Sequence, residues 1–236
     1  MKEIGGFLEW ETYSGAEYHQ EALALNSARN ALRFLLRARK IRSIWLPRLL
    51  CEVIEEACRA ENVEIRYYPV DASLRPVFLP EIARTEWVYL INYYGQYQKS
   101  EICEWAEQFH LILDNVQAFY TKPLDGLDTV YTCRKFFGVP DGAYLYTESV
   151  LPEELEQDSS CTRLEYLMGR FEHSANAFYG AYQQHEEQLG TLPIRWMSKG
   201  THNLLRTIDY ERAKHARENN FAYLHKGFGA VNRLNV

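Results

Sequence analysis

The stretch WVYLINYYGQYQKSEICEWAEQFHLILDN, residues 87–115, decides the fold class of this chain. It opens with the uninterrupted apolar run WVYLINYYG, which is typical of a strand covered on both faces. SEICEWAEQFH follows with helical spacing and a serine at its start, and LILDN is a second buried strand. A strand, a helix and a strand in this order predict a βαβ unit in a parallel sheet.

The same alternation continues on both sides of this unit. We expect a helix at LLCEVIEEACRAEN (49–62) and strands at SIWLP (43–47), VEIRYYPVD (63–71), TVYTCR (129–134) and GAYLYT (142–147). Residues 17–40 have apolar residues at helical intervals, with Asn26 or Ser27 as an N-cap within them. The pattern predicts an α/β fold, a three-layer αβα arrangement around a mostly parallel sheet. Ligands then bind at the carboxyl ends of the strands, where Pro47, Asn92 and Asp114 fall.

The pattern changes after Thr147. Residues 163–189 and 204–228 each read as one long helix, the intervening GTLPIRWMSKGTHN (190–203) reads as a loop, and AVNRLNV (230–236) is strand-like. A chain that stops as a new element begins suggests that a C-terminal small domain is largely missing. We therefore expect a large domain over residues 1–200, then a linker helix and the start of a truncated small domain over 201–236.

Composition narrows the functional classes. The chain of 236 residues is 47% hydrophobic and carries a formal net charge of −6, which argues against nucleic acid as a partner. Its five cysteines form no CxxC pair, which favours reduced thiols in the cytoplasm. No signal peptide is evident, and no apolar run reaches the roughly 18 residues of a membrane helix. The histidines show no metal-ligand spacing, so no catalytic metal is expected.

Asp114 and Lys135 stand out because each follows an apolar run, and a short connection separates the two strands. A lysine in a partly desolvated site can lose its proton and form a Schiff base with a carbonyl carbon. An aspartate at a strand end can hold a protonated ring nitrogen. Pyridoxal phosphate requires this pair of groups. Its phosphate could bind at the helix that opens at NSARNAL (26–32), with help from the Thr132 hydroxyl.

Five motifs in order resemble the DegT/DnrJ/EryC1/StrS aminotransferases, a sugar-aminotransferase-like branch of the fold-type I pyridoxal phosphate enzymes. They are LNSARNALRFLL (25–36), IWLPRLLCEVIEEACRAENVEIRYYPVD (44–71), LINYYGQ (90–96), LILDNVQAFY (111–120) and TCRKFFGVPDGAYLYT (132–147). With the later segment 194–224, the resemblance extends over nearly the whole chain from about Ala22 onward.

The resemblance implies a role for each matching residue. Lys135 would form the Schiff base and move the proton between cofactor and substrate carbons, and Asp114 would pair with the pyridine nitrogen. Gln117 would lie beside the phenolic oxygen. The residues expected at the phosphate are Ser27, Ala28, Arg29 and Thr132. Cys51 stands where the family has an aromatic residue stacked on the ring, and Asn92 is expected to line the pocket.

The chain departs from the family pattern at three of these positions. Ala28 replaces a glycine, which restricts the approach of the backbone to the phosphate. Arg29 replaces a hydroxyl residue, and it either binds the phosphate by charge or belongs to a solvated helix face. Cys51 cannot stack on a ring as Phe or Tyr does.

The function implied by the resemblance is transfer of an amino group from glutamate or another amino acid to a keto sugar, often nucleotide-linked, in a homodimer. The alternative is a truncated or degenerate relative that keeps the fold, and with it cofactor binding, without turnover. The altered phosphate segment and Cys51 favour this alternative. An unrelated α/β nucleotide-binding module would require a Gly-rich phosphate turn, and neither GxGxxG nor GxxxxGK[ST] occurs.

Overall fold

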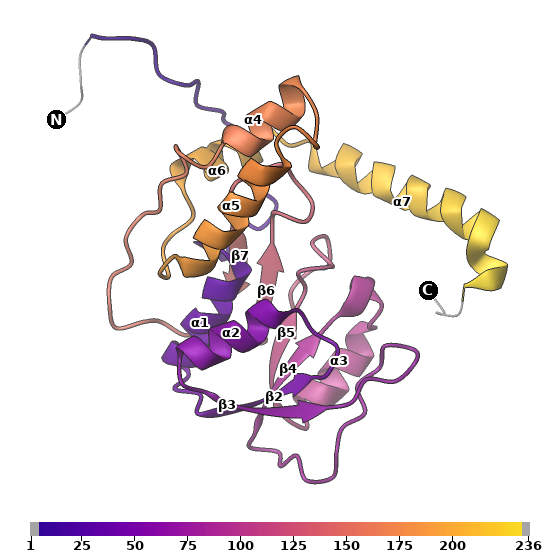
Figure 1. Ribbon diagram of the computed structural model, residues 1–236. Coiled ribbons are helices and arrows are strands. Elements are labelled where there is room, and N and C mark those ends of the chain that lie inside the picture. Colours follow the sequence, from indigo (N-terminus) through magenta and orange to yellow (C-terminus); the bar gives the residue numbers. More distant parts are fainter. Residues whose placement is uncertain (1–4, 233–236) are drawn as a thin grey trace.

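The computed structural model describes residues 5–232, which form one mixed sheet with helices on both of its faces (Figure 1). The strands are β1 (Leu23–Leu25), β2 (Ser43–Pro47), β3 (Glu64–Tyr68), β4 (Trp87–Ile91), β5 (His110–Asp114), β6 (Asp128–Thr132) and β7 (Ala143–Tyr146). The helices are α1 (Ala28–Ala38), α2 (Glu52–Ala60), α3 (Lys99–Ala106), α4 (Glu165–Glu172), α5 (Tyr179–Thr191), α6 (Lys199–Leu205) and α7 (Tyr210–Phe228). Short 3-10 turns occupy Tyr93–Gly95 and Gly229–Val231.

The strand order is β1-β7-β6-β5-β4-β2-β3, and it confirms a mostly parallel α/β fold. The pairs from β6 through β5, β4 and β2 to β3 are parallel, whereas β7 runs antiparallel to both of its neighbours. β2, β4, β5 and β6 each have a buried middle, because helices or loops cover both faces of a parallel sheet.

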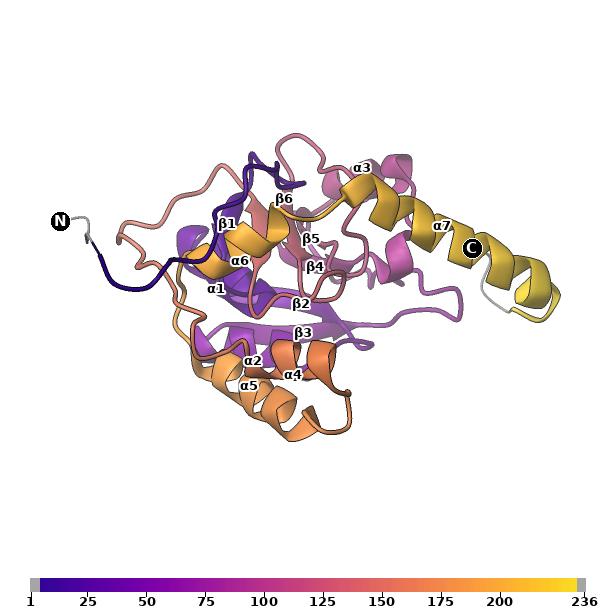
Figure 2. The same cartoon turned by 90° about the horizontal axis from the view of Figure 1, so that it is seen from above.

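The crossover rule explains the layers. α2 joins β2 to β3, and α3 joins β4 to β5 in the opposite direction along the sheet. Right-handed crossovers in opposite directions lie on opposite faces, and Figure 2 shows α2 and α3 on opposite sides of the sheet. Val130 of β6 packs in the same core cluster as residues of α1, whereas its neighbour Tyr131 packs in a second cluster with Leu205 of α6. The expected three-layer arrangement is therefore confirmed.

The N-terminal part of the predicted helix 17–40 is a strand instead. Leu23–Leu25 pairs with Ala143–Leu145 of β7, and Ala24 lies opposite Tyr144. The helix begins at Ala28, and its N-cap is Ser27, one of the two predicted caps, which accepts a hydrogen bond from the backbone N–H of Asn30. Pairing with β7, more than a hundred residues away in the chain, overrides the local helical spacing. Local spacing cannot predict such a pairing.

The predicted helix 163–189 is interrupted. α4 ends at Glu172 and α5 begins at Tyr179. The turn between them returns the ring of Phe178 onto Gly169, where a Cβ atom would lie 2.2 Å from the ring. Ser174 accepts a hydrogen bond from the N–H of Ala177 within the turn. The two helices therefore pack against each other as a hairpin instead of continuing in one line.

Three boundaries in the rest of the chain also differ from expectation. The loop predicted over 190–203 contains the start of α6, which Ser198 caps by accepting from the N–H of Thr201. The helix predicted over 204–228 begins only at Tyr210, capped by Asp209. The cap of α3 is Gln98, with Glu101 completing a capping box, and not Ser100.

The strand-like ending predicted over 230–236 is a 3-10 turn at its first two residues, and residues 233–236 lie outside the described part. The expected domain boundary between residues 200 and 201 lies within α6 and stays a prediction. Figure 1 shows α7 extending away from the sheet. Between residues 5 and 232, no helix is both long and apolar enough to cross a membrane.

Candidate active site

A cavity of about 480 Å³ opens at the carboxyl ends of the strands. Its walls come from the segments that follow β1, β2, β4, β5 and β6, and from α5. β2 and β4 are neighbours whose crossovers leave in opposite directions, which is the topological switch point where α/β sheets bind ligands. The predicted residues that line the cavity are Ser27, Ala28, Arg29, Cys51, Asp114, Gln117, Thr132 and Lys135.

Asp114 ends β5 and is almost completely buried, with 2% of its surface exposed. One carboxylate oxygen accepts from the N–H of Val116 over 2.8 Å, and the other accepts from the phenol of Tyr89 over 2.8 Å. Burial raises the pKa of Asp114, while the two hydrogen bonds and the charge of Lys135 oppose this rise. The site thus holds a carboxylate at the cavity wall that a cationic ligand group would further stabilise.

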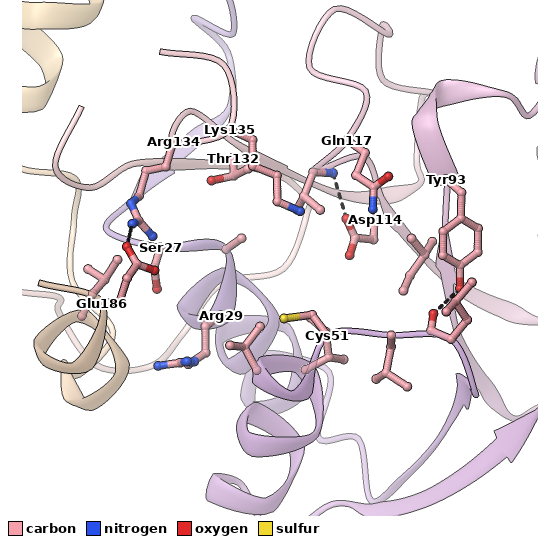
Figure 3. A pocket seen from close by; sticks show the side chains of 18 of the residues that line it. Ser27, Arg29, Cys51, Tyr93, Asp114, Gln117, Thr132, Arg134, Lys135 and Glu186 are labelled. Carbon is pink, nitrogen blue, oxygen red and sulfur yellow. Dashed lines mark hydrogen bonds and ion pairs between the residues drawn. The ribbon is translucent and has the colours of Figure 1, made fainter. Parts of the chain in front are cut away.

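Lys135 lies in the turn that follows β6 and projects into the same cavity (Figure 3). The carbonyl of Cys133 accepts from the N–H groups of Phe136 and Phe137, and this turn places Lys135 at the cavity mouth. β5 and β6 are adjacent and parallel, so their carboxyl ends bring Lys135 and Asp114 to one edge of the sheet. The structure brings both side chains to the wall of the same cavity.

Ser27 and the first residues of α1 form one end of the cavity. The hydroxyl oxygen of Ser27 accepts from Asn30, so its proton remains available to an anion. The N–H groups of the first helical turn point outward from the helix start, where the helix dipole favours negative charge. Thr132 also lines the cavity, and its hydroxyl donates a long hydrogen bond of 3.4 Å to the carbonyl of Gly142.

A buried ionic cluster holds the residue that precedes Ser27. Arg163 donates to carboxylate oxygens of Asp141 and Asp158, each over 2.9 Å, and all three side chains are buried. The side-chain amide of Asn26 donates to Asp158 over 3.1 Å. These contacts fix the turn from β1 into α1, and thereby the direction in which the helix start faces.

Two arginines lie at this end of the cavity. Arg29 is mostly buried and pairs with Glu56 over 3.0 Å, so it lies in the cavity wall and not on a solvated helix face. Arg134 pairs with Glu186 of α5. Sequence reasoning did not identify Arg134, Glu186 or the α5 residue Tyr182 as part of the site. Arg134 adjoins Lys135 in the chain, but α5 has no motif that would assign it to the cavity.

The remaining predicted residues differ in their surroundings. Cys51 is exposed at the start of α2 and lies in the cavity wall. Gln117 accepts from the N–H of Tyr94 over 3.2 Å. Asn92 does not line the cavity: it is fully buried, donates to Asn115 over 3.0 Å and accepts from the N–H of Tyr97 over 3.1 Å. Asn92 therefore holds the loop after β4.

The fold of this chain is found in one of the solved structures that match it. The sugar aminotransferase CalS13 from Micromonospora echinospora matches over 90% of this chain and 62% of its own, with a TM-score of 0.51 and 15% sequence identity. This likeness shows that the chain has the same fold. It is the fold that the five sequence motifs imply.

Two further solved structures match at lower TM-scores. L-threonine-O-3-phosphate decarboxylase from Porphyromonas gingivalis is 17% identical, covers 74% of this chain and 56% of its own, and has a TM-score of 0.44. A PLP-bound putative aminotransferase from Clostridium difficile 630 is 15% identical, and the match covers 71% of this chain and 52% of that protein, with a TM-score of 0.41. This chain spans less than two thirds of the length of each of the three structures. No family model and no curated protein matches its sequence.

Proposed function

We propose that this chain binds pyridoxal 5'-phosphate in the cavity and acts as an aminotransferase toward a keto sugar. The observation that carries the proposal is the pair formed by buried Asp114 and cavity-facing Lys135, at the adjacent ends of β5 and β6. A primary amine and a carboxylate on one cavity are the two groups that this coenzyme requires. CalS13, which has the same fold, is described as a sugar aminotransferase.

The donor set fits the three parts of the coenzyme. Asp114 has an oxygen lone pair left on each side of its carboxylate after the contacts with Val116 and Tyr89, and can accept a proton-bearing ring nitrogen. Lys135 provides the amine for the aldehyde carbon. Ser27 provides a hydroxyl donor at the start of α1, where a phosphate is also attracted by the free N–H groups.

Bound coenzyme supplies an electron sink for the carbon from which a proton is removed. The residues of the chain then have separate tasks. Asp114 keeps positive charge on the ring nitrogen, and the amine of Lys135 removes and returns the proton at its Nζ atom. Gln117, held by the N–H of Tyr94, lies at the cavity wall on the Asp114 side. Ser27 and the start of α1 bind the phosphate, and the end of the cavity that they form is called the anionic end.

The experiment is a titration of the purified chain with pyridoxal 5'-phosphate. We expect a visible absorption band and, after borohydride reduction, a mass increase on the peptide that contains Lys135. Lys135→Ala should lose both signals. Lys122→Ala, at an exposed lysine outside the cavity, should keep both. A band that persists in Lys135→Ala, or no band in the unaltered chain, would refute the proposal.

A second candidate is a protein that binds the coenzyme without turnover. The specific observation in its favour is that both arginines at the anionic end already have carboxylate partners, Glu56 and Glu186. Single-turnover mixing with glutamate and other amino donors separates the two candidates. Loss of the coenzyme band supports an aminotransferase, and a stable band supports the binding protein.

The proposal extends to assembly and location. A homodimer is expected for this fold type, and sedimentation of the chain with and without coenzyme tests it. The cysteines, which all lie in the described part of the chain, are unpaired, and this supports a reducing compartment such as the cytoplasm. Fractionation of cells that express the tagged protein tests the location.

A further inference from the structure

The anionic end of the cavity contains two arginines whose positive charges are neutralised by ion pairs. Arg134 pairs with Glu186, and Arg29 pairs with Glu56. Figure 3 shows the Arg134–Glu186 pair at the same end of the cavity as Ser27. The side chain of Arg134 is 20% exposed and that of Glu186 is 39% exposed, so both remain in contact with the cavity and its water. Taken together, the two pairs add no net charge to the site.

Neither guanidinium uses all of its donors. The Nε atoms of Arg29 and Arg134 are both buried and have no hydrogen-bond partner among the described residues. Arginine presents five N–H donors in a fork that matches the oxygens of a phosphate. These two Nε atoms lie below the cavity surface, but both arginine side chains line the cavity. A phosphate there offers a guanidinium more acceptor oxygens than one carboxylate does.

α5 contacts both arginines. Glu186 reaches Arg134 from this helix, and one turn further Gly190 faces Arg29. A Cβ atom at Gly190 would lie 2.7 Å from a terminal nitrogen of Arg29, so the guanidinium lies directly against this glycine. The helix therefore shapes the anionic end of the cavity as well as covering it.

We propose that Arg134 binds the phosphate group of the ligand, and that Glu186 is its counter-ion in the ligand-free protein. Glu186 then sets the affinity of the site for phosphate, because an incoming dianion must compete with this carboxylate for Arg134. The identification of the ligand as pyridoxal 5'-phosphate rests on the proposed function. The phosphate chemistry at Arg134 does not.

The test measures binding of inorganic phosphate by calorimetry in low salt. Glu186→Gln should bind phosphate about tenfold more tightly than the unaltered chain, because it frees one positive charge at the site. Glu187→Gln is the matched control, since it removes the same charge from the neighbouring, exposed position of α5. The control should bind as the unaltered chain does. Added salt should reduce the difference between the two variants.

Arg134 variants show whether the effect passes through this residue. Arg134→Gln should weaken phosphate binding, and Arg134→Gln/Glu186→Gln should bind no more tightly than Arg134→Gln alone. Circular dichroism checks that each variant is folded. The proposal is overturned if Glu186→Gln binds no tighter, if Glu187→Gln has an equal effect, or if the double variant keeps the gain.

A coenzyme arm separates this proposal from the proposed function. Glu186→Gln should tighten binding of pyridoxal 5'-phosphate by a similar factor and leave binding of pyridoxal, which lacks the phosphate, unchanged. If the phosphate results hold but no band depends on Lys135, the proposed function fails and the role of Glu186 stands. If the Lys135 band forms but Glu186→Gln changes neither ligand, the role of Glu186 fails alone.

Discussion

The phenol of Tyr89 donates a hydrogen bond of 2.8 Å to the Asp114 carboxylate, in a part of the core that scarcely contacts solvent. Tyr89 lies on β4 and Asp114 on β5, and the two strands are parallel neighbours. Burial also raises the pKa of Tyr89 well above its usual range, and the charge of Asp114 adds to that rise. The phenol therefore stays protonated and acts as a permanent donor to the carboxylate.

Tyr89→Phe should raise the pKa of Asp114 further, because it removes a donor that stabilises the ionised form. A protonated Asp114 cannot hold a cationic ring nitrogen. We therefore expect the affinity for pyridoxal 5'-phosphate to fall as the pH is lowered, with the fall starting at a higher pH than in the unaltered chain. Fluorescence titration at each pH measures this.

Tyr68→Phe is the control for that substitution. Tyr68 is also fully buried, and its phenol donates to the backbone carbonyl of Tyr89 over 2.8 Å without reaching Asp114. Each substitution should cost about 1 to 3 kcal/mol of unfolding free energy for the unpaired acceptor. Only Tyr89→Phe should move the pH dependence, and identical profiles for the two variants would contradict the role of Tyr89.

Cys51 should be protected from alkylation by bound coenzyme. Its side chain is exposed and lines the cavity, whereas Cys161 is exposed elsewhere and serves as an internal reference. At a coenzyme concentration about tenfold above the dissociation constant, the modification rate of Cys51 should fall about tenfold. Peptide mass spectrometry after timed labelling gives both rates. Equal slowing of the two cysteines, or of neither, would place the coenzyme away from Cys51.

Gly142→Ala should destabilise the protein by about 1 to 3 kcal/mol, because it combines backbone strain with crowding. Gly142 has a φ of +114°, and a Cβ atom there would lie 3.1 Å from Thr201 and 3.2 Å from the sulfur of Cys133. Gly126→Ala is the comparison, since its φ is +74° and no atom lies within 4 Å. Urea unfolding should show the larger loss for Gly142→Ala. Equal losses would show that crowding at Gly142 contributes nothing.

His19 should make the protein less stable in mild acid. Burial lowers the pKa of His19 from 6.5 to about 4, so the folded chain keeps the ring neutral where the unfolded chain protonates it. The contribution of His19 to the free energy of unfolding is therefore fully present above pH 6.5. It is lost as the pH falls from 6.5 toward 4, by about 3 kcal/mol.

His19→Gln measures that contribution. The variant should show a flatter unfolding free energy between pH 7 and 4.5 than the unaltered chain. His215→Gln, at an exposed position on α7, should keep the original slope. A slope that is unchanged in His19→Gln would assign the acid sensitivity to other groups.

Local sequence predicted the central part of the fold well. β2 begins and ends at the predicted residues, and β5 and β6 begin one residue before their predicted runs, because each is an apolar run bounded by polar or turn residues. β4 begins at the predicted residue but ends at Ile91, and the rest of its predicted run contains a 3-10 turn. β1 was missed, since it has three residues and exists through its pairing with β7. The break between α4 and α5 was missed because it depends on the packing of Phe178 against Gly169.

Some residues of the candidate site could be predicted from local sequence, and others could not. Residues at strand ends and at the start of α1 could be predicted, because a parallel sheet brings those positions to one edge. Asn92 follows β4 as expected, but its amide turns toward Asn115 and away from the cavity. Arg134 and Glu186 could not be predicted as partners, since 52 residues separate them and α5 folds back onto the sheet edge through tertiary packing.

The pairing of Ala24 with Tyr144 has a consequence for the order of synthesis. β1 emerges early from the ribosome, yet its neighbour in the sheet is made about 120 residues later, after every other strand. Contacts so distant in sequence raise the contact order and delay the closing steps of folding. Ser27 lies two residues after β1, and Glu186 lies on α5 beyond β7, so the anionic end of the cavity is completed only after β7 and α5 have been translated. A nascent chain interrupted before β7 would expose β1 and lack that end of the site.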